Sequence, residues 1–185
     1  MQPIFRFICV LISASFSGPI PPLEASKLHM RVLPNDLDFN FHMNNARCLA
    51  ISDLGFVDFV LRLGLGKILR AKGWRPLFGG RLVRHRFGLR AFERFVVATR
   101  LICWDDKWFY FDQRMETSRG VAIIVLTKGL IYDRGTARTI GPSELLDTLG
   151  LLTQSPKMPP EVRQWLSTEK LLHIPEVTRL SVGRN

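Results

Sequence analysis

The chain has 185 residues, which is enough for one domain with a sizeable core and too few to expect two. A hydrophobic content of 46%, with thirteen phenylalanines and four tryptophans, excludes a disordered chain. The formal net charge of +10 attracts anionic lipid or a phosphate-bearing ligand, but the basic residues form no block and match no nucleic-acid-binding motif, so no nucleic-acid partner is predicted.

The chain begins with an apolar segment at residues 4–16, which is followed by a Pro-rich break at Gly18–Pro22. Thirteen residues cannot span a bilayer as a helix, because spanning needs about 20. Arg6 lies inside the apolar run, whereas a secretory signal carries its charge before that run. We therefore expect residues 1–25 to be an apolar helix and linker that stay in the mature protein. The helix either packs on the domain or lies in the plane of a membrane interface.

The three cysteines, Cys9, Cys48 and Cys103, are odd in number and widely spaced. This pattern indicates buried free thiols in a reducing compartment, so a cytoplasmic protein is predicted, with membrane association left open. No Cys/His spacing typical of a metal site occurs, and no cofactor-binding glycine loop, so neither a metal nor a cofactor is predicted.

A polar cluster then leads directly into the most apolar helical pattern of the chain. The polar residues are Asn35, Asp36, Asp38, Asn40, His42, Asn44 and Asn45. From Leu49 to Leu65, apolar residues occupy nearly every side of a 3.6-residue period, which predicts a helix buried on most faces. Asn44 or Asn45 is the predicted N-cap. Asp58 and Arg62 are four residues apart, and we expect them to pair on the remaining solvent-facing stripe.

Strand patterns surround this helix. One precedes it at Leu28–Leu33, and four follow it, at Arg75–Arg86, Glu93–Trp104, Trp108–Thr117 and Val121–Tyr132. Gly79 and Gly80 predict a bulge in the first of these four. The order predicts an α+β domain over residues 26–140, in which an antiparallel sheet covers its apolar face with the one long helix. Helices predicted at Pro142–Leu152 and Glu161–Leu172 form a C-terminal extension over residues 141–185.

The polar cluster resembles the motif Asp-x-Asp-x-x-Gly-His-x-Asn-Asn-x-x-Tyr-Leu of hotdog-fold acyl-CoA thioesterases of the 4-hydroxybenzoyl-CoA thioesterase type. The matching residues are Asp36, Asp38, His42, Asn44, Asn45 and Leu49. Phe41 stands where Gly is usual, and Cys48 where Tyr is usual. The resemblance covers about Leu28 to Tyr132. It implies the hotdog fold, with a curved antiparallel sheet wrapped around one long central helix, an acyl-CoA substrate, and a homodimer or higher homo-oligomer with its site at a subunit interface.

In this family the second Asp of the motif is the catalytic carboxylate, which gives that role to Asp38. Cleavage of a thioester needs a nucleophile, or a base for water, and donors for the developing oxyanion. A carboxylate at the start of a helix could supply the first, and the free helical N–H groups near Asn45 the second. His42 either orients the loop, assists proton transfer or is structural. Asp36 is expected to stabilise the loop.

Two further features concern substrate binding. Arg84 and Arg86 belong to a group of arginines on and after the second strand, and their spacing predicts that they share one face. Arginine suits the phosphates of CoA, although a charged, solvated sheet edge explains the same residues. Phe41 is expected to narrow or reshape the thioester site.

Two alternatives to a thioesterase remain open. Hydratases of the same fold resemble Asp-x-Asn-Pro-x-His, with Asp and His five residues apart, whereas Asp38 and His42 are four apart and no Pro lies between them. The second alternative is a protein that binds acyl chains or acyl-CoA at a membrane surface without turning them over. Release of free CoA from acyl-CoAs distinguishes the binder from the thioesterase.

Overall fold

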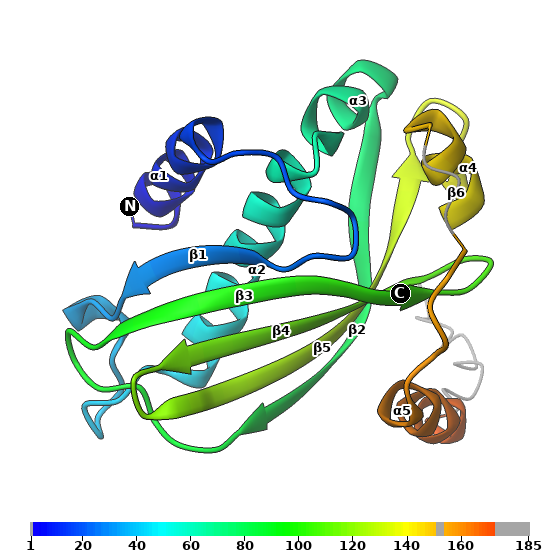
Figure 1. The fold of residues 1–185 in the computed structure, drawn as a ribbon. Coiled ribbons are helices and arrows are strands. Elements are labelled where there is room, and N and C mark those ends of the chain that lie inside the picture. The colour runs from blue at the N-terminus through cyan, green and yellow to red at the C-terminus, as the bar shows by residue number, and fades with distance from the viewer. Residues whose placement is uncertain (1, 151–153, 173–185) are drawn as a thin grey trace, which may run out of the picture.

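A curved antiparallel sheet wraps around the long helix α2 (Asn45–Arg62), as predicted (Figure 1). The computed structural model describes residues 2–150 and 154–172. The sheet has the strand order β1-β3-β4-β5-β2, and β6 pairs with β5. The strands are β1 (Ser26–Arg31), β2 (Trp74–His85), β3 (Arg94–Trp104), β4 (Phe109–Thr117), β5 (Gly120–Asp133) and β6 (Arg138–Ile140). The bulge predicted in β2 is present, as a register shift between Phe78 and Gly80.

Shorter helices surround this unit: α1 (Gln2–Phe16), the 3-10 helix η1 (Pro34–Asp36), α3 (Leu65–Lys72), α4 (Pro142–Thr148) and α5 (Pro160–Leu171). The apolar pattern of α2 runs on through Leu65, but the helix ends at Arg62 because Gly64 adopts a left-handed φ of 79° and starts α3 in a new direction. Residues 151–153 and 173–185 of the predicted C-terminal extension lie outside the described residues.

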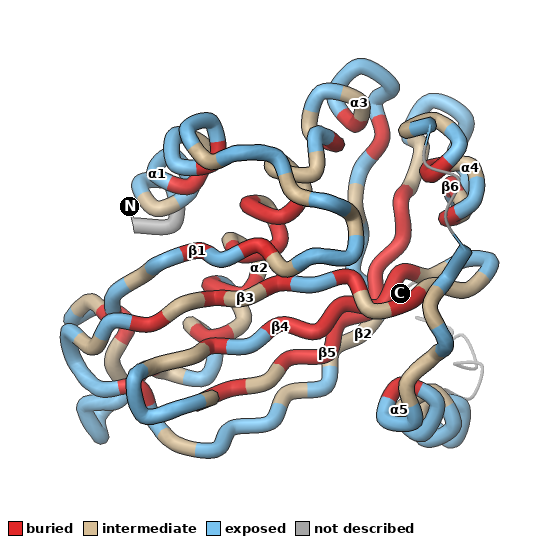
Figure 2. Tube along the Cα trace, viewed as in Figure 1, coloured by how far each residue is buried: buried red, intermediate tan, exposed pale blue. Residues whose placement is uncertain are grey.

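The inner face of the sheet packs against α2, and the two form the main core. Ile51 of α2 lies in one buried cluster with Val97, Met115 and Val125 of three neighbouring strands. Figure 2 shows the burial concentrated along α2 and the central strands. On the outer face, α5 covers one end of the sheet by placing Val162 against the buried Cys103 and Tyr110.

The cysteines are free, and two of the three fit the prediction. Cys48 and Cys103 are buried, and burial raises the pKa of each thiol to about 11, which keeps both unreactive at neutral pH. Cys9 is exposed, so the prediction that it is buried is wrong, because it lies on the outward side of α1.

A buried glycine and a polar network set how closely α2 approaches the sheet. A Cβ atom on Gly55 would lie 2.6 Å from Val97 Cγ1 and 2.8 Å from Thr99 Oγ1. Beside it, the buried Gln113 donates from Nε2 to the Ser52 carbonyl at 2.7 Å and to Thr99 Oγ1 at 3.2 Å. The backbone of α2 at Gly55 therefore packs directly against side chains of β3. The side chain of Gln113 hydrogen-bonds to buried polar groups that would otherwise be unpaired.

The predicted surface pair of Asp58 and Arg62 is wrong. Asp58 is only 2% exposed, and Arg62 donates instead to the Gly18 carbonyl at 3.1 Å. Among the described residues, neither Asp58 Oδ2 nor the buried Ser26 Oγ has a hydrogen-bond partner. Burial raises the pKa of Asp58, and the neighbouring Ser26 hydroxyl and the charge of Arg62 oppose that shift.

The apolar segment at the N-terminus forms α1 and packs on the domain. Val10 and Ala14 are buried against it, and α1 lies over α2 beside the edge strand β1 (Figure 1). The Arg6 side chain reaches Asp36 in the loop before α2, with 2.6 Å between Nη2 and Oδ2. No helix within residues 2–150 and 154–172 is long and apolar enough to cross a membrane.

Gly55→Ala should destabilise the fold by roughly 1–3 kcal/mol, because the added methyl overpacks the contact with β3. At an exposed position in a helix, a Gly→Ala change would stabilise the protein by about 1 kcal/mol. The sign of the change in unfolding free energy therefore shows whether Gly55 is packed against the sheet. Urea unfolding measures it. Gly66→Ala in α3 is the matched control, since its methyl would meet only the flexible end of Leu61. A stabilised Gly55→Ala variant would contradict the close approach.

Asp58→Asn should become more stabilising relative to the wild type as the pH rises from 4 to 7. A carboxyl whose pKa is raised by folding costs no stability below its unfolded pKa of about 3.9 and an increasing amount above it. Melting temperatures of both proteins across this range test the expectation. Asp53→Asn, at a half-exposed carboxylate paired with Arg81, is the control and should show no such rise. A pH-independent difference for Asp58→Asn would count against a buried, strained carboxyl.

Candidate functional site

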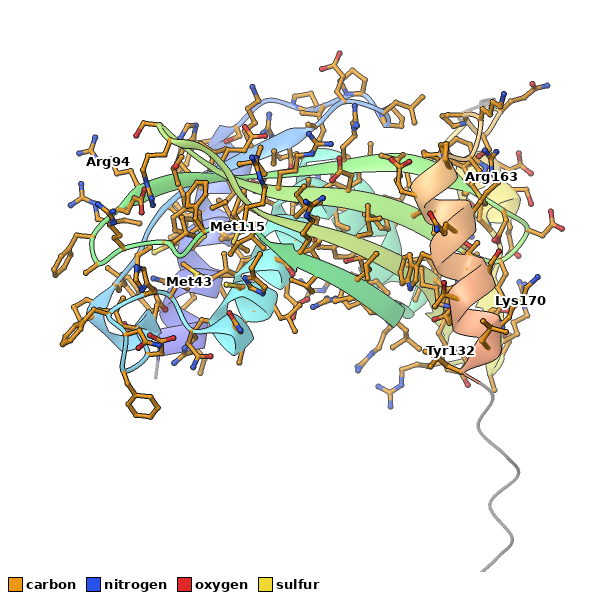
Figure 3. All side chains as sticks on the ribbon, turned by 90° about the horizontal axis from the view of Figure 1, so that it is seen from below. Met43, Arg94, Met115, Tyr132, Arg163 and Lys170 are labelled. Atoms are coloured by element: carbon orange, nitrogen blue, oxygen red, sulfur yellow. The ribbon has the colours of Figure 1, made fainter. Side chains whose placement is uncertain are left out.

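A surface hollow of about 230 Å³ lies at the N-terminal end of α2. It is formed by the loop before α2, the start of α2, the end of β2 with the segment that follows it, and Ile123 of β5. Four of the six predicted site residues line it, namely Asp38, His42, Asn45 and Arg86. Met43, which also lines the hollow, is labelled in Figure 3 and marks this end of the molecule.

The loop holds Asp38 by hydrogen bonds on both its main chain and its side chain. Its N–H donates to the His42 carbonyl at 2.8 Å, and Oδ1 accepts from the N–H groups of Asn40 at 2.9 Å and His42 at 3.3 Å. These contacts are the Asx-turn pattern expected of an Asp in a tight loop. No hydrogen bond to Oδ2 forms within the described part of the chain, so one carboxylate oxygen remains available for a ligand or for water.

The neighbouring Asp36 anchors the same loop, as predicted. Its carboxylate, only 2% exposed, accepts from Arg6 and from the Leu33 N–H at 2.9 Å. Its carbonyl accepts from the Asn44 N–H at 2.8 Å. The two aspartates therefore differ in kind, since Asp36 is buried and fully paired while Asp38 borders the hollow.

The start of α2 brings helical N–H groups to the hollow. Asn44 is the N-cap, and its side-chain oxygen accepts from the Ala46 N–H at 2.8 Å. Asn45, the first helical residue, is exposed, and its N–H lies ahead of the intrahelical hydrogen bonds. The helix dipole adds partial positive charge here, so this N–H can donate to an anion in the hollow.

His42 packs over a glycine on the opposite wall of the hollow. A Cβ atom on Gly88 would lie 2.6 Å from His42 Cδ2 and 2.7 Å from Cγ. The main chain of His42 forms an isolated β-bridge with Arg90, which joins the two walls. The imidazole of His42 is thus held by contact with the Gly88 backbone, and it can take this position only because Gly88 has no side chain.

Phe41 and Arg84 are the two predicted residues that do not line the hollow. Phe41 is 76% exposed and adopts a left-handed φ of 56°, which explains why glycine suits this position in the motif. Arg84 is paired in register with Ile124, and its side chain alternates with those of Val83 and His85, so it lies on the outer face of the sheet. Arg86, beyond the end of β2, donates from Nη1 to the Val121 carbonyl at 3.3 Å.

Sequence reasoning did not single out His85 or Gly88 as site residues. His85 follows Val83 by two positions and therefore shares its inward face, which places it in the hollow. That period-two signal was available in the sequence. The role of Gly88 was not, because it depends on which side chain crosses from the other wall.

A second hollow, at the opposite end of α2, is apolar and narrow. It measures about 40 Å³ and is enclosed by side chains such as Phe59, Leu69 and Leu145. Along α2, the ion pair of Asp53 with Arg81 lies between this slot and the first hollow. Phe56, which lines the slot, contacts Phe78 of β2 edge to face at 4.9 Å. The described residues that line the slot have only apolar side chains, so none of them could act on a thioester.

Comparison with known proteins agrees with this geometry. The family model of the thioesterase-like superfamily matches residues 32–166, which include α2, strands β2 to β6 and the hollow. The chain belongs to the thioesterase-like superfamily.

Relatives by sequence include Protein THEM6 of Xenopus laevis, 33% identical over 138 residues, which are 73% of this chain and 64% of that protein. The Probable thioesterase YBR096W of Saccharomyces cerevisiae is 28% identical over 125 residues, 65% of this chain and 53% of its own length. The matched region therefore spans about half to two thirds of these relatives.

Solved structures share the fold at low sequence identity. The probable thioesterase YbaW from Escherichia coli superposes with a TM-score of 0.59 and 19% identity, covering 66% of this chain and 95% of YbaW. SAV2348 from Staphylococcus aureus, solved in complex with CoA, gives a TM-score of 0.63 and 14% identity, covering 78% of this chain and 96% of SAV2348. These matches confirm the hotdog fold of the thioesterases.

Gly88→Ala should displace the His42 imidazole and leave the fold intact, because the added methyl occupies the space of the ring and His42 is exposed. The NMR signals of the His42 ring should move, while methyl signals of the core residues Ile51 and Val97 should not. Gly18→Ala is the control, since a methyl there meets nothing within 4 Å. Unchanged His42 signals in the Gly88→Ala protein would show that the ring does not rest on this glycine.

Proposed function

We propose that this member of the thioesterase-like superfamily hydrolyses the thioester of an acyl-CoA, with Asp38 as the catalytic carboxylate. The observation that carries the proposal is the pairing of two groups at one hollow: a carboxylate with a free oxygen on Asp38, and the helical N–H of Asn45. Thioester hydrolysis requires such a pair, because one group must deliver the attacking oxygen and the other must stabilise the oxyanion.

In the proposed reaction, Oδ2 of Asp38 either attacks the thioester carbonyl directly or removes a proton from an attacking water. The carbonyl oxygen becomes an oxyanion that accepts from the Asn45 N–H at the positive end of α2. Collapse of the tetrahedral intermediate breaks the C–S bond and releases the CoA thiolate, which takes up a proton. If Asp38 is the nucleophile, water then hydrolyses the mixed anhydride to free acid. His42 lines the same hollow as Asp38 and Asn45, and it is the candidate for delivering the proton that the CoA thiolate takes up.

The CoA part of the substrate is proposed on two grounds. SAV2348, a structural neighbour, was solved with CoA bound. Arg86 and His85 at the rim of the hollow can meet phosphate charge. Arg84, on the outer face, would reach the same CoA only around the sheet edge, so Arg86 is the better candidate for a phosphate contact.

The homodimer stays a prediction. β2 is an edge strand of the sheet, and it carries the exposed apolar side chains Leu77, Phe78 and Leu82. An edge of this kind favours pairing with another copy of the chain. Association there would add residues of a second copy beside α2.

Asp38→Asn should lower the turnover of acyl-CoA by at least about a hundredfold, the scale for loss of a main base or nucleophile. An Asn oxygen can still accept from Asn40 and His42, so the loop should keep its shape and the melting temperature should hardly change. Release of free CoA from a panel of acyl-CoAs measures turnover.

The control is Asp106→Asn, at an exposed turn residue away from the hollow, which should be fully active. Full activity in Asp38→Asn would remove Asp38 from the mechanism. Acyl-CoA binding without any CoA release by the wild type would instead favour a non-catalytic acyl-CoA-binding protein. Addition of water to an enoyl-CoA, with its thioester intact, would favour a hydratase.

A further inference from the structure

Helix α1 carries its apolar residues on the side that faces away from the protein. Ile4, Ile8, Ile12 and Phe16 follow one another at intervals of four and form one ridge, with Phe5 beside it; we call these five residues the apolar ridge. They are between 47% and 88% exposed. A helix on the surface of a globular domain ordinarily presents polar residues to water, so the exposed apolar ridge of α1 is unusual.

The helix is nevertheless fixed to the domain. Its only charged residue, Arg6, points inward, where it pairs with the buried carboxylate of Asp36 and donates to the Arg31 carbonyl at 3.2 Å. Val10 and Ala14, on the same inward side, are buried. The exposure of the ridge is therefore a property of the folded domain. A rotation of α1 that buried the ridge would turn Arg6 outward and leave the buried Asp36 carboxylate without its ion-pair partner.

A group of basic side chains lies at the sheet edge next to α1. Lys27 and Arg31 are exposed on β1, and Arg94 of β3 is exposed and paired in register with Arg31; we call these three the basic edge. Figure 3 shows Arg94 projecting at the end of the sheet away from α5. None of the three forms an ion pair within the described residues. Glu24 is the only acidic residue in positions 1–35.

We propose that the apolar ridge and the basic edge form one surface that binds an anionic lipid bilayer. The ridge enters the boundary between headgroups and acyl chains, and the long side chains of the basic edge contact lipid phosphates from the rim. The net charge of +10 strengthens the attraction to anionic lipid. The basic edge beside the ridge therefore favours an anionic bilayer as the cover for the ridge.

This proposal does not depend on the thioesterase activity, because its test is physical binding. The full chain is sedimented with vesicles of phosphatidylcholine alone and with vesicles that also contain phosphatidylglycerol. We expect binding to the anionic vesicles at least about tenfold stronger than to the neutral ones, and weaker binding as salt is raised.

Two sets of variants separate the contributions. Ile8→Ser with Ile12→Ser removes the middle of the ridge, and Lys27→Gln, Arg31→Gln and Arg94→Gln together remove the basic edge. Each set should lower binding to anionic vesicles by at least about tenfold. The matched controls lie on the distant helix α5 and the residues next to its two ends, and should bind as the wild type does. They are Leu171→Ser with Leu172→Ser, both exposed and apolar, and Lys157→Gln, Arg163→Gln and Lys170→Gln.

The outcomes are distinct. Loss of binding in both variant sets with retention in both controls supports the proposal. Absence of vesicle binding by the wild type overturns it, and so does binding that the ridge variants leave unchanged. A dimer in light scattering that the ridge variants dissolve would assign the ridge to a second copy of the chain and would also overturn it.

Discussion

The close contact between α2 and the sheet at Gly55 is the constraint on which the rest of the structure depends. Val97 and Thr99 occupy the space that a side chain at Gly55 would need. Beside this contact, Gln113 of the sheet hydrogen-bonds to the backbone carbonyl of Ser52 in α2 and to Thr99. Because packed interiors do not slide, this contact sets the distance of α2 from the strands along its whole length. The N-terminal end of α2 is thereby held opposite the end of β2, and the gap between these two ends is the hollow.

The chemistry of the hollow follows from that placement. A helix N-terminus supplies donors and partial positive charge only within its first turn, so a carboxylate must be held within reach of it to act on the same ligand. The loop achieves this with its two aspartates, since Asp36 is buried against Arg6 and secures the chain while Asp38 keeps one oxygen free. The ion pair also ties α1 to this loop, so the helix with the apolar ridge is in direct contact with the loop that carries Asp38.

Sequence patterns predicted the sheet, the central helix, its N-cap and four of the residues that line the hollow, because periodicity, caps and motif spacing are local properties. They failed where a tertiary contact decides. Asp58 has the spacing of a surface partner for Arg62, but periodicity cannot tell which side of a mostly apolar helix is the covered one. Arg84 and Arg86 share a face only if the strand continues, and β2 ends at His85. The side of α1 that faces outward was likewise not predictable from the sequence, since Arg6 turns inward to pair with Asp36, thirty residues away.

The central claim is that a thioester lies between Asp38 and the start of α2. A crystal structure with a non-hydrolysable acyl-CoA analogue, in which a methylene group separates the sulfur from the carbonyl, tests it most directly. The account predicts the analogue's carbonyl oxygen at about 2.7–3.2 Å from the Asn45 nitrogen. It also predicts a carboxylate oxygen of Asp38, or a water bound to it, at about 3–3.5 Å from the carbonyl carbon. An analogue whose carbonyl binds away from both groups, for example at the apolar slot near Phe59, would contradict the account.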